Sequence, residues 1–124
     1  MRFERVDRLS EFSREIKKLG KRYGTIEDDL ATLINTLLFA YHKLGLTHDG
    51  VKRVDDLGHT RIPVFKAKKF ACKSLKGKGS RTGLRLIYAY DEDADRIELI
   101  EIYSKSDKDT ENRERIKKVY GARK

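Results

Sequence analysis

The chain has few of the residues that usually signal a disulfide-rich or membrane protein. It has 124 residues with one cysteine, one proline and no tryptophan. The single Cys72 cannot form an internal disulfide, which excludes a disulfide-stapled fold. The longest stretch without a charged residue, from Leu30 to His42, is short of the ~20 apolar residues that a membrane-spanning helix needs. The first residues carry charges where a signal peptide is apolar, so we expect a cytoplasmic protein with no membrane partner.

Acidic residues are absent between Leu57 and Tyr90. This segment holds nine lysines and arginines, which matches the formal net charge of +9 that follows from 29 basic and 20 acidic side chains. So many like charges in one segment repel one another, and a polyanionic partner relieves that repulsion. We therefore predict that the segment binds nucleic acid or an acidic protein. Five of its basic residues are expected to bind RNA: Arg61, Lys73, Lys76, Lys78 and Arg81.

The apolar residues recur with the periods of regular secondary structure. Helical spacing predicts helices over 10–20, 25–45 and 109–120. β-branched and aromatic residues between turn signals predict strands over 64–72, 84–90 and 96–104, and 1–8 is compatible with a short strand. The predicted fold is one α+β domain over 1–124 with the order β-α-α-β-β-β-α. We expect a small antiparallel sheet with a helical hairpin packed on one face, helices on that face only, and the basic segment on the other face.

No pattern predicts a metal or cofactor site. The three histidines lack metal-ligand spacing, and His42 reads as a surface or half-buried residue. The aspartates over 91–95 imitate the start of a calcium loop, but Arg96 and Ile102 replace its glycine and glutamate. The glycines over 77–83 fit neither phosphate-binding fingerprint. We therefore expect no cofactor and no metal.

The strongest candidate for chemistry is a group of cations on the predicted strands. Side chains two residues apart on a strand share a face, so Lys66 and Lys68 project together, and a neighbouring strand can bring Arg85 beside them. Lys105, at the end of the last strand, completes the rim of this group. Like charges on adjacent strands repel unless an anion lies between them. The pattern therefore predicts a site for a ribose–phosphate link.

Three stretches of these strands resemble a known family. They are FKAK at 65–68, GLRLIY at 83–88 and IEIYSK at 100–105. Together with the helical segments over 12–30 they resemble the RelE/ParE superfamily, the toxins of bacterial type II toxin–antitoxin modules, over about residues 8–108. The resemblance implies a RelE-like fold in a cytoplasmic toxin that cuts messenger RNA without a metal, usually in the ribosomal A site, and so inhibits translation. The implied partners are a tightly bound cognate antitoxin, messenger RNA, the ribosome, and operator DNA only through the antitoxin complex.

The resemblance also suggests catalytic residues. Lys66 and Lys68 match the family's paired strand lysines, Arg85 its strand arginine, and Lys105 the basic end of its last strand. The family's C-terminal tyrosine has no match, because its expected neighbourhood holds Glu111. Metal-free RNA cleavage needs a base for the 2′-hydroxyl, stabilisation of the phosphoryl charge and an acid for the 5′-oxygen. We expect Lys68 as base, Lys66 as charge stabiliser, Arg85 as the phosphoryl ligand and Lys105 as phosphate ligand or acid, and these roles are exchangeable.

Two other functions are open to the same sequence. A toxin of the ParE branch keeps the fold but poisons DNA gyrase by binding it, and it needs no nuclease site. A non-catalytic RNA- or ribosome-binding module needs only the cations. The grouping of Lys66, Lys68 and Arg85 favours cleavage, whereas the missing tyrosine favours binding without cleavage.

Overall fold

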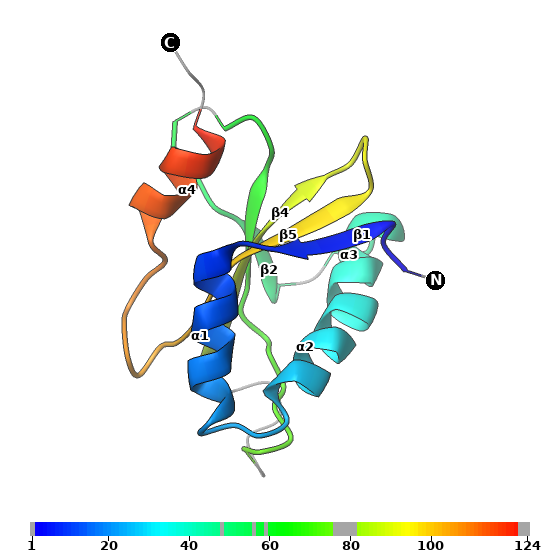
Figure 1. Cartoon of the computed structure of the whole chain (residues 1–124). Coiled ribbons are helices and arrows are strands. Elements are labelled where there is room, and N and C mark those ends of the chain that lie inside the picture. The colour runs from blue at the N-terminus through cyan, green and yellow to red at the C-terminus, as the bar shows by residue number, and fades with distance from the viewer. Residues whose placement is uncertain (1, 48, 56, 59, 76–81, 122–124) are drawn as a thin grey trace.

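The fold is built around a five-stranded sheet, shown in Figure 1. The computed structural model describes residues 2–47, 49–55, 57–58, 60–75 and 82–121. The strands are β1 (Arg5–Arg8), β2 (Val51–Arg53), β3 (Val64–Ala67), β4 (Leu84–Asp91) and β5 (Arg96–Ser104). They lie in the order β1-β5-β4-β3-β2. β1 runs parallel to β5, and the other neighbouring pairs are antiparallel.

A helical hairpin covers one face of the sheet (Figure 1). Its first arm is α1 (Ser10–Gly20), and its second arm is the continuous run of α2 (Ile26–Leu33), the π-helical turn η1 (Ile34–Leu38) and α3 (Phe39–Lys43). Apolar residues at helical spacing on both arms meet alternate residues of β4 and β5, and this contact forms the larger core. None of the helices in the described part of the chain has the length and apolar run needed to cross a membrane.

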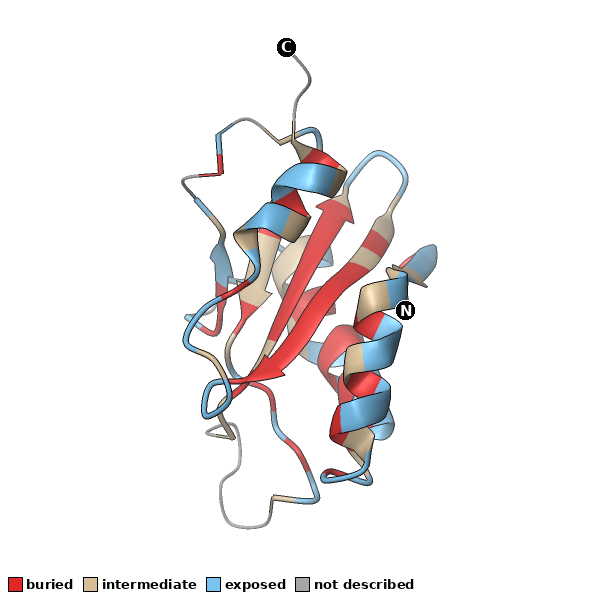
Figure 2. Cartoon of the chain, turned by 60° about the vertical axis from the view of Figure 1, so that its left-hand side comes forward, coloured by how far each residue is buried: buried red, intermediate tan, exposed pale blue. Residues whose placement is uncertain are grey.

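The last helix, α4 (Arg113–Tyr120), packs on the opposite face of the sheet. Its Ile116 and Tyr120 contact a second core that includes Ile87, Ala89 and Ile100. The buried strands β4 and β5 therefore lie between two layers of helix, as Figure 2 shows. On this face α4 covers the middle of β4 but not the start of the strand near Leu84. The candidate site lies at that start.

The structure confirms an α+β fold but corrects two expectations about the sheet. The sheet is mixed rather than antiparallel, because the N-terminal strand pairs in parallel with β5. Helices lie on both faces, since α4 turns its apolar side toward the face expected to be free of helices. The residues of a short edge strand do not determine which strand it pairs with. The residues of a charged helix do not determine which face of the sheet it covers.

The element bounds also differ in places. The strand predicted over 64–72 ends at Ala67, although Phe70 and Cys72 beyond it are still buried. An unpredicted strand, β2, lies within 46–62. Helix α4 begins at Arg113 because the Asn112 side chain caps it, accepting a hydrogen bond from the Arg115 amide at 3.0 Å.

Candidate active site

Five cations lie on the α4 side of the sheet, toward the end where β4 begins. Residues directly paired across neighbouring strands project to the same face. Lys52 pairs with Lys66, and Lys66 pairs with Ile87, which belongs to the core under α4. Arg85 lies two residues before Ile87 on the same strand, so it shares that face. We call this group the cationic face; its members are Lys52, Lys66, Lys68, Arg85 and Lys105.

Two members of the cationic face come from residues just beyond a strand end. The Lys68 amide donates to the Gly50 carbonyl at 2.7 Å, and the Lys105 amide donates to the Gly83 carbonyl at 2.8 Å. Gly83 has φ +80 with only ordinary contacts around an added Cβ, so its backbone conformation is what requires glycine. The first bond fixes Lys68 beside the start of β2, and the second fixes Lys105 beside the start of β4.

The charges of the cationic face act together on Lys68. Partial burial lowers the pKa of Lys68, and the positive charges of the other four members lower it further. Lys68 makes no ion pair with any residue that the structure describes. The charged ammonium form of Lys68 is therefore disfavoured. Loss of its proton, or binding of an anion, removes the unfavourable repulsion between the cations.

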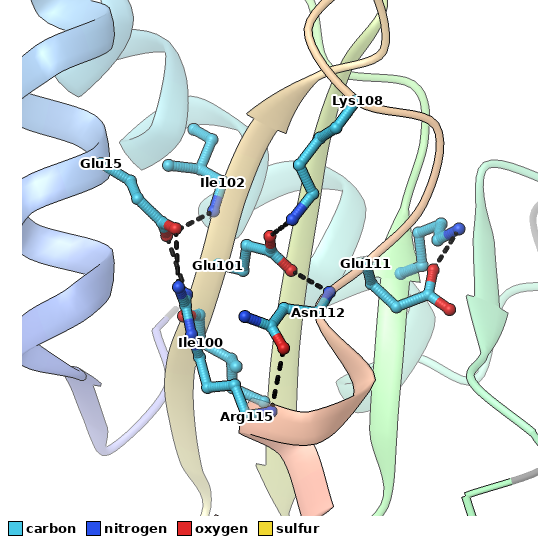
Figure 3. A network of polar contacts seen from close by, with 9 residues as sticks. Glu15, Ile100, Glu101, Ile102, Lys108, Glu111, Asn112 and Arg115 are labelled. Atoms are coloured by element: carbon cyan, nitrogen blue, oxygen red, sulfur yellow. Dashed lines mark hydrogen bonds and ion pairs between the residues drawn. The ribbon is translucent and has the colours of Figure 1, made fainter.

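Lys66 differs from Lys68 because a buried carboxylate neutralises it. Its Nζ lies 2.6 Å from Glu111 Oε1, and Arg113 Nε lies 3.1 Å from the other carboxylate oxygen. Glu111 is only 5% exposed. Burial raises the pKa of this carboxyl, but the close Lys66 ammonium, together with hydrogen bonds from the backbone and Thr110, lowers the pKa below its ordinary value. Figure 3 shows Glu111 just before α4, so an ionised carboxylate stands at the edge of the cationic face.

Arg85 both supports the site and remains able to bind an anion. Its Nη1 donates to the carbonyls of Lys68 and Leu84, each at 3.2 Å. A guanidinium has five N–H donors, so holding these carbonyls leaves others for phosphoryl oxygens. Arg85 thereby ties the main chain of Lys68 to β4.

Tyr103 is a site residue that the sequence reasoning missed. It pairs directly with Arg85 and is 5% exposed. Burial raises the pKa of its hydroxyl to about 12, helped by the charges of Glu111 and Glu101 and opposed by Arg85. The phenol therefore keeps its proton at neutral pH and can donate. The sequence did contain a signal for this, because Tyr103 is near the end of a predicted strand and two residues before Lys105.

Arg61 and Lys73, the other predicted RNA contacts that the structure describes, do not join the cationic face. Arg61 donates from Nη2 to the Val119 carbonyl at 2.6 Å, at the end of α4. The Lys73 amide donates to Asp29 at 3.0 Å, near the start of α2. Lys76, Lys78 and Arg81 lie outside the described residues. Lys52 was missed because no strand was predicted around it.

The described histidine, His42, belongs to the core on the opposite face. It is half-buried, as predicted, and its Nε2 lies 2.7 Å from the hydroxyl of Tyr88. Burial lowers the pKa of His42 to about 4, so the ring is neutral at physiological pH. It takes no part in the cationic face.

Comparison of the chain with protein-family models, curated proteins and solved structures finds no match. Within the described residues, no three His, Cys, Asp or Glu side chains are grouped so that they could hold a metal ion. The functional argument therefore depends on the chemistry of the cationic face.

The strain on Lys68 has a measurable effect on stability. Because its folded-state pKa lies below the ordinary 10.5, its charge opposes folding at pH 7, and this penalty disappears as the pH rises toward 10.5. We expect Lys68→Met to raise the free energy of unfolding by up to about 1 kcal/mol at pH 7, with a smaller gain at pH 10. Urea denaturation at both pH values measures this. Equal gains at the two values, or a gain matched by Lys69→Met, would contradict it.

Proposed function

We propose that this chain is a metal-independent endoribonuclease, the toxin of a type II toxin–antitoxin pair, and that it cleaves messenger RNA on the ribosome. The observation that carries the proposal is Lys68, which lies among four other cations, has a lowered pKa and makes no ion pair within the described part of the chain. Cleavage of an RNA link requires a base beside a strongly positive phosphate site. The cationic face supplies both within one group of side chains.

The proposed reaction uses the 2′-hydroxyl of the substrate as nucleophile. The neutral amine of Lys68 accepts the 2′-hydroxyl proton, and the 2′-oxygen forms a bond to phosphorus. Arg85 binds the phosphoryl oxygens, and Lys66 adds positive charge as the bond to the 5′-oxygen breaks. Lys105 donates the proton that the leaving 5′-oxygen takes up. The products are a 2′,3′-cyclic phosphate and a 5′-hydroxyl end.

The toxin assignment adds a protein partner. An acidic antitoxin segment would complement the charge of the cationic face and block its access to RNA. Support for this part comes from charge and from the resemblance of the strand residues. Co-expression with the product of the adjacent reading frame tests it, because an antitoxin must co-purify with the chain and relieve growth inhibition.

Binding without cleavage is the second candidate function. Two members of the cationic face are already engaged within the protein, since Glu111 neutralises Lys66 and main-chain carbonyls hold Arg85. A module that only binds RNA needs no free base. The experiment below separates the two functions.

The deciding experiment maps RNA ends. The purified chain is incubated with messenger RNA in EDTA, with and without translating ribosomes, and 5′ ends are mapped by primer extension. We expect new 5′-hydroxyl ends with the wild type and none with Arg85→Ala. Salt-sensitive binding without new ends would overturn the nuclease proposal, and inhibition of gyrase supercoiling instead would favour the ParE branch.

The proposed base also predicts a pH dependence. Only the neutral amine of Lys68 accepts a proton, so the cleavage rate should rise with pH by up to about tenfold per unit until the lowered pKa of Lys68 is reached. Single-turnover rates between pH 6 and 9, corrected for RNA hydrolysis without protein, measure this rise of the cleavage rate with pH. A flat profile in the wild type would exclude Lys68 as the base.

A further inference from the structure

A second positive surface runs along α1 and the turn that directly follows it, outside the cationic face. Its side chains are spaced three and four residues apart, which places them on one side of the helix. All of them are exposed, whereas the helix's acidic Glu11 and Glu15 are partly buried. We call this surface the α1 row; its members are Arg14, Lys17, Lys18, Lys21 and Arg22.

The acidic side of α1 is turned toward the sheet and does not neutralise the row. Glu15 accepts hydrogen bonds from Arg115 and from the Ile102 amide, as Figure 3 shows. Within the described residues, only Arg22 of the α1 row is ion-paired, to Asp107 at 3.1 Å. The other four cations are exposed and make no ion pair with a residue that the structure describes, although the charges of Arg14 and Glu11 interact.

A groove lies beside the α1 row, between α1 and the end of β5. It has a volume of about 350 Å³; α1 contributes Lys18 and Leu19 to its walls, and the turn after α1 contributes Arg22. The opposite wall includes Tyr103, which pairs directly with Arg85 of the cationic face. The carboxylates of Glu15, Glu101 and Asp107 also line the groove, and each is paired with a cation: Arg115, Lys108 and Arg22 respectively. The groove thus leads from the α1 row to Tyr103, the strand neighbour of Arg85.

We propose that the α1 row binds the phosphates of the RNA strand that flanks the bond held at the cationic face. The apolar residues of α1 are buried, so its outer side offers cations but no apolar anchor of the kind that protein interfaces use. Lysines and arginines without such anchors suit phosphates, whose recognition is independent of base sequence. The inference rests on the proposed function for the position of the scissile bond, but it concerns binding alone.

The test measures binding of RNA that cannot be cleaved. Fluorescent 2′-O-methyl RNA of 3 and 12 nucleotides is titrated with the wild type, with Lys17→Gln/Lys21→Gln, and with the matched control Lys117→Gln/Lys118→Gln on α4. We expect the α1 variant to lose about tenfold affinity for the 12-mer at 0.1 M salt and to lower its salt slope by about 1.4, since each single-strand phosphate contact contributes ~0.7. Its affinity for the 3-mer should be unchanged, and the control should bind both RNAs like the wild type.

Three results would overturn the inference: equal affinity of the wild type for the two lengths, equal losses in the α1 and α4 variants, or a loss for the 3-mer as large as for the 12-mer. Thermal unfolding of each variant shows whether it is folded. The probe RNA lacks the 2′-hydroxyl nucleophile, so the binding measurement does not depend on cleavage. It remains valid even if the chain cleaves no RNA. The loss of length-dependent binding likewise says nothing about new RNA ends.

Discussion

Lys68→Met is expected to lower the single-turnover rate of RNA cleavage by about 10²- to 10⁴-fold, the contribution of one well-placed proton-transfer group. The thioether side chain keeps the shape of the lysine stem but can neither accept a proton nor carry charge. The domain should remain folded, because Lys68 is partly exposed and its charge opposes folding. The same substitution should therefore stabilise the protein and disable it.

The neighbouring residue provides the matched control. Lys69 is exposed, lies 3.6 Å from Asp49, and lines a hollow beside Thr32 and Thr36 of the hairpin. Lys69→Met removes the same charge and should leave the cleavage rate within about threefold of the wild type. A large loss in this variant would show that net charge rather than Lys68 limits the reaction.

A third variant separates proton transfer from phosphate binding. Lys68→Arg keeps the positive charge, but a guanidinium is not deprotonated near neutral pH. We expect it to bind RNA like the wild type and to cleave as slowly as Lys68→Met. If Lys68→Arg cleaves at the wild-type rate, Lys68 stabilises charge and another group is the base.

Much of the cationic face was predictable because strand alternation is a local rule. The sequence shows Lys66 and Lys68 two residues apart, and β3 and β4 pair so that Lys66 stands opposite Ile87. Arg85 then follows from the same alternation on β4. The bounds of β5 were also predicted correctly, since turn signals enclose a run of apolar residues there.

The missed features depend on contacts between distant parts of the chain. Lys52 joins the site only because the short strand β2 pairs with β3, and nothing in a polar segment announces that pairing. The partner of Lys66 is Glu111, whose burial is created by the approach of α4 to the second face. Sequence pattern located the residues, but tertiary packing decided which charges are neutralised.

Glu101→Ala should lower the free energy of unfolding by about 1.5–3 kcal/mol, the contribution of hydrogen bonds to a charged group. Glu101 is 1% exposed in the middle of β5, where its carboxylate accepts from the Lys108 ammonium and, at 2.7 Å, from the Asn112 amide (Figure 3). Alanine leaves that ammonium and that amide without their acceptor. Because Asn112 caps α4, the loss spreads to the helix that covers the second face.

Urea denaturation and hydrogen exchange measure these two effects. Glu101→Gln keeps an acceptor for Asn112 but loses the charge that pairs with Lys108, so it should cost about half as much. The exposed Glu114, on α4 itself, is the control, and Glu114→Gln should change stability by less than about 0.5 kcal/mol. Under native conditions, the α4 amides should exchange faster in Glu101→Ala than in the wild type. The exchange rates of the α1 amides should change less. Uniform acceleration in both helices would show that the carboxylate stabilises the whole domain rather than the attachment of α4.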